Sequence, residues 1–198
     1  MKLIIDDMIE DNDNLLLTNK FVTGFRLKLT LTSDNIVIVL PSKTSLSLTN
    51  LTFKEIKESS KNLYTLKETL EIFKNHQKEL ILDISSLGNK TNLFIDLILV
   101  EIQKYRDLNF SFETSDVAIY QYLKNTNYPS YLITNNCKDK VIIKRKDKNY
   151  FFNKVSSLTN LYKLLNNHSN SFPLYIIISR KIKKSLLSNS SLLRLLEE

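Results

Sequence analysis

The chain has 198 residues, of which 42% are hydrophobic, and this length and composition predict a single globular domain over residues 1–198. Its apolar runs are much shorter than the roughly 20 residues of a membrane span, and Asp6 and Asp7 interrupt the apolar start too early for a signal peptide. A single cysteine, Cys137, excludes an internal disulfide and favours a cytoplasmic location.

The net charge of +7 raises the question of nucleic-acid binding. Two basic clusters, Lys138–Lys148 and Arg180–Lys184, carry much of this charge. Their basic residues alternate with apolar ones, as on the solvated face of a strand or helix. The chain has no zinc-finger spacing, glycine-rich phosphate loop or RNA-binding motif. The sequence therefore disfavours nucleic acid as a partner, and a basic adaptor for nucleic acid or an acidic protein is kept as the second alternative function.

The first predicted elements are a strand at Leu3–Ile5 and, after an acidic segment, a short helix or strand from Leu15. A longer strand follows at Phe25–Leu31, in which every odd position is apolar. This period of two places Arg26 and Lys28 together on the opposite face of the strand.

The next elements are a strand and two helix starts. Ile36–Leu40 is an apolar run typical of a strand buried on both faces, and Pro41 ends it. Thr52–Glu55 and Thr65–Glu68 both have the T-x-x-E spacing of a capping box, in which a threonine and a glutamate satisfy free N–H groups at a helix start. The sequence therefore predicts helices from these two points.

The rest of the chain alternates strands with helices. The predicted helices are Phe53–Ser59, Leu66–His76, Asn92–Leu108, Asp116–Asn125, Leu158–Asn166 and Leu186–Leu196. The predicted strands are Leu80–Ile84, Asn109–Phe112, Ser130–Ile133, Val141–Lys144 with Tyr150–Phe152 as a hairpin partner, and Leu174–Ile178. Such alternation predicts a mostly parallel α/β fold, but it does not choose between a barrel and an open sheet.

Several short segments carry a more specific pattern. They are Gly24–Lys28, Leu31–Asn35, Val39–Ser42, Leu51–Ile56, Tyr64–Leu70 and Asp83–Ser85, followed by Ser111–Glu113 and Pro129–Thr134. Their order and spacing resemble the glycerophosphodiester phosphodiesterases. In that family the first six segments read Gly-x-Glu-x-Asp, Leu-Thr-x-Asp-Gly, Val-Val-x-His-Asp, Leu-Thr-x-x-Glu-Leu, Thr-Leu-x-Glu-x-Leu and Glu-Ile-Lys, and Ser-Phe-Asp follows later.

This resemblance implies a TIM barrel and a link to glycerophospholipid metabolism. The family has a further strand, containing Gly-x-Asp, beyond the point matched by the end of this chain. The resemblance therefore implies an incomplete or distorted (β/α)8 barrel. The strands at Leu3–Ile5 and Leu174–Ile178 would then have unpaired edges. We expect the helix Leu186–Leu196, a second copy of the chain or another protein to cover them.

The positions that carry the family's chemistry hold other residues here. Family members bind a divalent metal through the two acids of Gly-x-Glu-x-Asp and the glutamate of Glu-Ile-Lys, and use two histidines as general acid and base. The matching positions are Arg26 and Lys28 for the two acids, Pro41 and Ser42 for the His-Asp pair, Asp83 for the glutamate and Ser85 for the lysine. The segment matched to the first histidine, Ile4–Met8, contains none.

Electrostatics makes a metal cofactor unfavourable at this site. Arg26 and Lys28 would each repel a cation by roughly 4 kcal/mol per pair of unit charges at about 4 Å and an effective dielectric near 20. The two histidines, His76 and His168, lie outside any motif and are interpreted as ordinary surface residues. We therefore expect no metal and no catalytic residue.

The sequence thus predicts a catalytically inactive protein of this family, binding a phosphate-containing ligand or serving as a regulatory or interaction module. The first alternative is a glycerophosphodiester phosphodiesterase with an atypical site, in which Asp6, Asp7 and Asp83 hold a metal.

Arg26 and Lys28 offer two hypotheses. Alternate positions on one strand set them about 7 Å apart, and arginine presents a bidentate fork, so together they would hold a phosphate or another anion. Alternatively they pair with acids such as Asp83 and fill the vacated cavity as a buried ion pair. The anion hypothesis requires all three side chains to converge at one mouth of the barrel.

Overall fold

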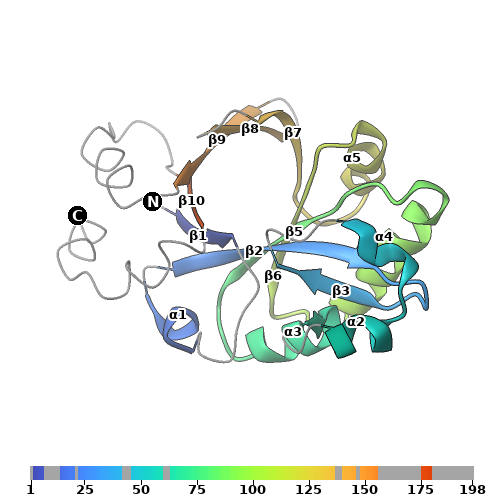
Figure 1. Ribbon diagram of the computed structural model, residues 1–198. Helices are drawn as coiled ribbons and strands as arrows, with labels where there is room; N and C mark the ends of the chain where they lie inside the picture. The colour runs from blue at the N-terminus through green and yellow to red at the C-terminus, as the bar shows by residue number, and fades with distance from the viewer. Residues whose placement is uncertain are drawn as a thin grey trace.

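The computed structural model describes residues 2–6, 14–20, 22–41, 46–59, 63–136, 140–145, 148–155 and 175–179, with side chains for 3–6, 16–20, 22–41, 48–59 and 63–133. Figure 1 shows the strands arranged around a ring, with the described helices outside it. None of the helices in these ranges has the length and apolar character needed to cross a membrane.

Eight of the ten described strands form a closed ring. In order around the ring they are β1 (Lys2–Asp6), β2 (Val22–Leu31), β5 (Glu79–Asp83), β6 (Asn109–Thr114), β7 (Ser130–Asn136), β8 (Lys140–Arg145), β9 (Lys148–Val155) and β10 (Tyr175–Ser179). β10 then pairs in parallel with β1, from Lys2 opposite Tyr175 to Asp6 opposite Ser179. The barrel that the family resemblance implied is present.

The regular (β/α)8 pattern breaks at β8. This strand runs antiparallel to both β7 and β9, whereas all other neighbours in the ring are parallel. Antiparallel neighbours need only a tight turn, but parallel neighbours need a crossover of a dozen or more residues. In Figure 1 the strands β7, β8 and β9 form a continuous arc with no described helix between them. The barrel is therefore distorted and lacks part of the βα repeat, as expected.

The predicted unpaired edges at the first and last strands are wrong. β1 pairs with both β2 and β10, and β10 pairs with both β1 and β9. The β8–β9 hairpin contributes two strands over residues 140–155, so the ring is completed without a further βα unit. The helix predicted at Leu186–Leu196 lies outside the described residues.

Two further strands extend the sheet beyond the ring. β3 (Val37–Leu40) forms an antiparallel hairpin with the end of β2, and β4 (Tyr64–Thr65) pairs with β3. Asn35 takes a left-handed φ of 60° in the hairpin turn, a conformation that asparagine tolerates better than most residues. β3 is thus an added strand at the barrel rim and not a member of the ring.

The described helices are α1 (Asn14–Thr18), α2 (Phe53–Ser59), α3 (Leu66–Phe73), α4 (Thr91–Ile102) and α5 (Val117–Lys124). Both predicted capping boxes are formed, because the threonine and the glutamate of each T-x-x-E segment bond to each other's backbone N–H groups. α3 and α4 end earlier than predicted, where tight turns from His76 N–H to Phe73 O and from Tyr105 N–H to Ile102 O close them.

The two faces of the barrel sheet differ in character. Alternate strand residues such as Leu27, Leu82 and Phe112 are fully buried in one apolar core with the helix residues Phe73 and Phe94. This core lies between the outside of the ring and the helices. The residues between them on each strand face the interior of the barrel, because successive side chains point to opposite faces. The interior face is the one that carries charge.

Candidate functional site

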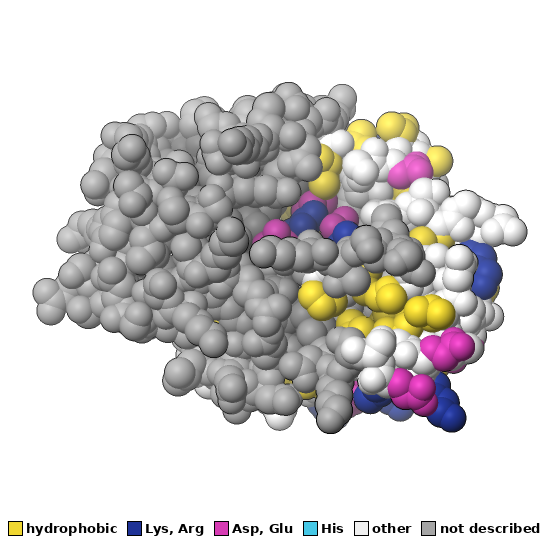
Figure 2. Space-filling model, in the orientation of Figure 1, with side chains coloured by type: hydrophobic (Ala, Val, Ile, Leu, Met, Phe, Trp, Pro, Cys, Tyr) yellow, Lys and Arg dark blue, Asp and Glu magenta, His cyan; other side chains and the backbone are white. Residues whose placement is uncertain are grey.

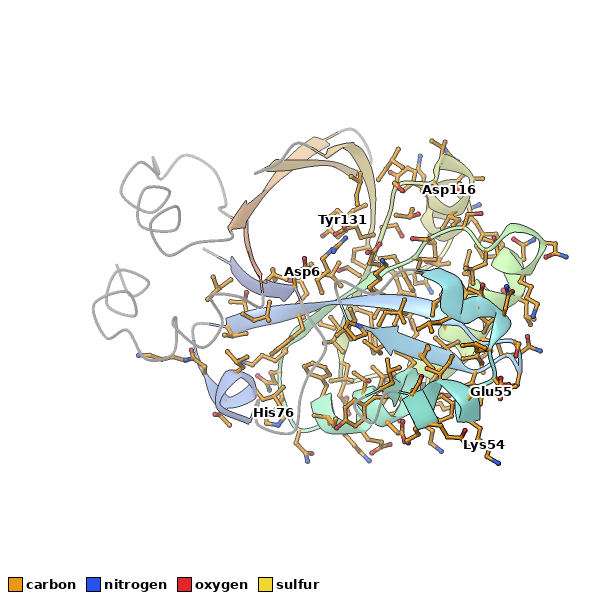
Figure 3. The ribbon with its side chains drawn as sticks, in the orientation of Figure 1. Asp6, Lys54, Glu55, His76, Asp116 and Tyr131 are labelled. Atoms are coloured by element: carbon orange, nitrogen blue, oxygen red, sulfur yellow. The ribbon has the colours of Figure 1, made fainter. Side chains whose placement is uncertain are left out.

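Four charged side chains meet where β1, β5 and β6 end beside the middle of β2. They are Asp6 on β1, Arg26 on β2, Asp83 on β5 and Glu113 on β6, and we call them the Arg26 cluster. Asp6 lies opposite Arg26 in the strand register, and Asp83 lies opposite Glu113. Figure 3 places Asp6 and Tyr131, the register neighbour of Glu113, toward the middle of the ring. Figure 2 shows acidic and basic side chains together near the centre of the same face.

The guanidinium group of Arg26 contacts all three carboxylates. Its Nη1 donates to Asp6 Oδ1 at 2.8 Å and its Nη2 to Asp83 Oδ2 at 2.9 Å. Its Nε and Nη2 both donate to Glu113 Oε1, at 3.0 and 2.6 Å. One planar cation therefore joins acids from three other strands.

The Arg26 cluster lies at the edge of the buried interior. The side chains of Arg26, Asp83 and Asp6 are 11%, 14% and 21% exposed, and that of Glu113 is 1% exposed. Burial alone would lower the pKa of Arg26, but Glu113, Asp83 and Asp6 together raise it well above its ordinary value. The guanidinium is therefore charged at any pH at which the protein folds.

Glu113 is the most constrained member of the Arg26 cluster. Burial raises its pKa above the ordinary value, against the lowering effect of the Arg26 charge and hydrogen bonds. Its Oε2 atom is buried and has no hydrogen-bond partner among the described residues. A carboxylate left this way is costly, so the site favours a proton or a positive charge at Glu113.

The residues present do not fit the divalent metal that the family resemblance implies. Hard cations such as Mg²⁺ and Ca²⁺ require several oxygen ligands, and Asp6, Asp83 and Glu113 are oxygen donors of that kind. Each of them, however, is already within hydrogen-bond distance of Arg26. A metal ion sharing these three carboxylates would lie against a guanidinium that is permanently charged.

The sequence-predicted site residues fall into four groups. Arg26 and Asp83 come together as a buried ion pair, as the alternative to anion binding predicted. Lys28 lies opposite Asp83 in the strand register and has no ion-pair partner within the described part of the chain. Pro41 directly follows β3 and Ser85 lies two residues beyond β5. Asp7 and Ser42 fall outside the described residues.

Of the two histidines, His76 is the one that the structure describes, and it is remote from the Arg26 cluster. His76 lies in the turn before β5, whereas Asp83 is the last residue of that strand. His76 and Asp83 are therefore separated by the length of β5, which is about 13 Å at 3.3 Å per residue. Figure 3 shows His76 near the periphery, away from Asp6. His168 is outside the described residues.

Glu113 is the site residue that the sequence interpretation missed. Ser111–Glu113 was matched to a strand end of the family, but no role followed for the glutamate. The available signal was an acid that alternates with Phe110 and Phe112, the two buried apolar residues of the same strand. Asp6 had been considered only as a metal ligand, and the structure pairs it with Arg26 instead.

Comparisons with known proteins show similarity in fold only. No family model matches the chain, and no curated protein matches it in sequence. The structure is similar to that of an Agrobacterium tumefaciens protein described as a glycerophosphoryl diester phosphodiesterase, with a TM-score of 0.58 and 10% identity over 94% of this chain and 96% of the other.

Two further solved structures agree with this comparison. The glycerophosphodiester phosphodiesterase of Parabacteroides distasonis gives a TM-score of 0.54 at 11% identity, over 99% of this chain and 97% of the other. The enzyme of that name from Thermotoga maritima gives 0.52 at 14% identity, over 94% and 97%. The chain therefore has the fold of the glycerophosphodiester phosphodiesterases, as the sequence resemblance predicted.

Proposed function

We propose that this protein, which has the fold of the glycerophosphodiester phosphodiesterases, does not hydrolyse phosphodiesters and acts as a ligand-binding or regulatory module. The observation that carries the proposal is the guanidinium of Arg26 held between Asp6, Asp83 and Glu113. It places a fixed positive charge among carboxylates at the carboxyl end of the barrel strands, where the active sites of such barrels lie.

A fixed guanidinium differs from a metal ion in its chemistry. Arginine has no exchangeable position for water or substrate, and its pKa is too high for it to act as an acid or base near neutrality. All three carboxylates of the Arg26 cluster are committed to it. The Arg26 cluster therefore supports the barrel mouth electrostatically, and the guanidinium at its centre offers no group for general acid–base catalysis.

The ligand in this proposal contains phosphate, in keeping with the family resemblance. Arg26 is a poor anchor for it, because three carboxylates surround its guanidinium and would repel an anion. Lys28 is the remaining cation of the original pair. The anion hypothesis for Arg26 and Lys28 therefore depends on Lys28 and on other groups at the same end of the barrel.

Turnover of glycerophosphodiesters tests the proposal. We expect purified protein with glycerophosphocholine or glycerophosphoethanolamine, in Mg²⁺ or Ca²⁺, to release glycerol phosphate no faster than a protein-free blank. The informative variant is Asp83→Ala, with the exposed Glu58→Ala on α2 as its control. Metal-dependent turnover that Asp83→Ala abolishes and Glu58→Ala leaves intact would overturn the proposal and favour the hydrolase alternative.

That hydrolase alternative would use Asp6, Asp7 and Asp83 with a metal. Two of these acids, Asp6 and Asp83, do converge, and this convergence is the observation in its favour. Both are bonded to Arg26, however, so the guanidinium would have to leave before a metal could enter. The basic clusters that suggested a nucleic-acid adaptor lie outside the described side chains.

A further inference from the structure

Exposed apolar side chains gather on α4 and α5, which Figure 1 shows on the outside of the ring. Five large hydrophobic residues are exposed among the described side chains, and four of them belong to these two helices: Leu93 and Val100 on α4, Val117 and Tyr122 on α5. The fifth, Leu51, lies just before α2. Exposed apolar residues scattered singly need no explanation, whereas this concentration indicates an interaction surface.

Helix α4 is apolar on its outer side as well as on its inner side. The inner side packs into the core through four buried residues: Phe94, Ile95, Ile98 and Ile102. The outer side carries Leu93, Leu97 and Val100 at the i, i+4, i+7 spacing of one helix face. A helix that is apolar all round is typical of one covered on both sides. Within the described part of the chain, however, Leu93 and Val100 stay 43% and 57% exposed.

One acid, Asp96, lies in the middle of this outer stripe. Its Oδ1 accepts a hydrogen bond from Tyr122 Oη of α5 at 2.8 Å, and it forms no ion pair with any described side chain. A carboxylate fixed among apolar side chains favours a partner that is apolar and carries a positive charge. It disfavours a lipid surface, because a carboxylate is costly in hydrocarbon. We call this set of residues the α4–α5 face: Leu93, Asp96, Leu97, Val100 and Tyr122.

A positive charge lies one turn beyond Val100, at the end of the same helix. The side chain of Lys104 is 57% exposed. The bond from Gln103 N–H to Leu99 O keeps the backbone on the helical path up to this point. Asp96 and Lys104 thus lie four residues to either side of Val100, which is about 6 Å along the axis in each direction at 1.5 Å per residue.

A twofold axis at Val100 would bring these opposite charges together. If two antiparallel α4 helices are related by such an axis, Val100 faces its own counterpart, and Asp96 of each copy faces Lys104 of the other. A shift of the axis toward the start of the helix would pack Leu97 against Val100. It would also set Asp96 against Glu101, so that two acids would meet. Charge complementarity therefore selects the arrangement centred on Val100.

We infer that a second copy of this chain docks on the α4–α5 face and forms a symmetric dimer in which α4 packs against α4. The seam is apolar at Val100 and Leu97, and an Asp96–Lys104 pair closes it at each end. Two short helices from each copy give a small interface, so the dimer is weak and forms at micromolar concentrations. The face lies outside the ring, whereas the Arg26 cluster faces the interior, so this inference is independent of the proposed function.

Sedimentation velocity over a series of protein concentrations tests the inference. We expect a monomer–dimer equilibrium for the wild type. Val100→Lys, Asp96→Lys and Lys104→Glu should each raise the dissociation constant roughly tenfold or more, because each sets like charges against one another across the seam. Leu51→Lys and Lys54→Glu are the matched controls, since they change an exposed apolar residue and an exposed lysine outside the α4–α5 face. Both controls should dimerise like the wild type.

A mixture of the two charge variants gives the sharpest test. Asp96→Lys and Lys104→Glu together restore both pairs of opposite charges, so the equimolar mixture should form heterodimers although each variant alone is monomeric. Tyr122→Phe removes the hydrogen bond that is also lost in Asp96→Lys, and it should still dimerise. A wild type that stays monomeric, a mixture that fails to pair, or equal effects of the variants and the controls would overturn the inference.

Discussion

Arg26 donates four hydrogen bonds to three carboxylates, an arrangement that depends on the shape of its side chain. The guanidinium is planar and has donors on three nitrogens, whereas a lysine concentrates its donors on one. Only the planar group spreads charge toward β1, β5 and β6 at once. Arginine at this position therefore links strands that are distant in the sequence.

The first prediction concerns the loss of this link. Arg26→Ala leaves three carboxylates together without a cation, so we expect it to destabilise the protein by roughly 3–5 kcal/mol in chemical denaturation. Arg106→Ala, at an exposed position after α4, should change stability by about 0.5 kcal/mol or less. Millimolar guanidinium should partly restore the denaturation midpoint of Arg26→Ala and leave the midpoint of the wild type unchanged. Equal effects of both substitutions would contradict the role given to Arg26.

The second prediction concerns pH. The pKa of Glu113 is raised by burial above its ordinary value of 4.5. Above pH 4.5 the unfolded chain releases this proton while the folded chain retains it, so stability falls as pH rises toward the folded pKa. Below pH 4.5 both states hold the proton and the effect is absent.

Glu113→Gln should remove this contribution and flatten the fall in stability with rising pH. Denaturation midpoints between about pH 4 and pH 8 measure it. Glu58→Gln, an exposed acid on α2, is the control. Parallel pH profiles for wild type and Glu113→Gln would show that Glu113 has an ordinary pKa.

At the scale of single elements, the capping boxes determine where helices begin. Thr65 accepts from Glu68 N–H at 3.1 Å, and the Glu68 carboxylate accepts from Thr65 N–H at 2.7 Å. Two otherwise unsatisfied N–H groups are thereby paired at the start of α3. These bonds are local in the sequence, which is why the T-x-x-E spacing predicted them.

The third prediction follows from this cap. Thr65→Ala should lower the free energy of unfolding by about 1 kcal/mol, because it removes the side-chain acceptor of the helix. Lys67→Ala, at an exposed position on the same helix, has no part in the cap and should have little effect. A loss no larger than that of Lys67→Ala would mean that packing alone fixes the start of α3.

A fourth prediction concerns the approach of β2 to β5. A Cβ atom on Gly24 would lie 2.5 Å from the backbone oxygen of Glu79, so the two strands come too close for any side chain there. Gly24→Ala should therefore destabilise by roughly 1–3 kcal/mol, as overpacked sites do. Ala118→Ser, at an exposed position on α5, is a control for a small change of volume. An unaltered denaturation midpoint in Gly24→Ala would refute this tight contact.

At the scale of the whole molecule, local patterns predicted the elements better than their pairing. Period-two alternation gave β2, and the apolar run at Leu80–Ile84 gave β5 to within one residue at each end. The antiparallel pairing of β8 with β7 depends on contacts between strands, which no local pattern encodes. The β8–β9 hairpin was predicted, but the sequence did not show that these two strands would complete the ring.

The same limit applies to the site. Arg26 and Asp83 were singled out because they stand at positions of a known pattern. Asp6 and Glu113 complete the Arg26 cluster from strands 20 and 87 residues away from Arg26 in the sequence. Such separations become contacts only through the parallel register of the barrel, so sequence spacing alone could not assign them.

Closure of the barrel gives a fifth prediction. Amide protons of β10 should exchange slowly with solvent, because this strand pairs on both sides, with β1 and β9. Hydrogen exchange followed by mass spectrometry should give Tyr175–Ser179 protection comparable to Glu79–Asp83 in β5. Exchange at the rate of an unpaired strand would contradict closure of the ring and support the open-edged barrel expected from the sequence.

The central claim is that the guanidinium of Arg26 takes the place of a metal ion among Asp6, Asp83 and Glu113. Calorimetric titration of folded wild type and folded Arg26→Ala with Ca²⁺ and Mg²⁺ tests it most directly. The claim predicts no saturable binding by the wild type and the appearance of a single site in Arg26→Ala. Saturable binding by the wild type that Asp83→Ala abolishes would contradict it.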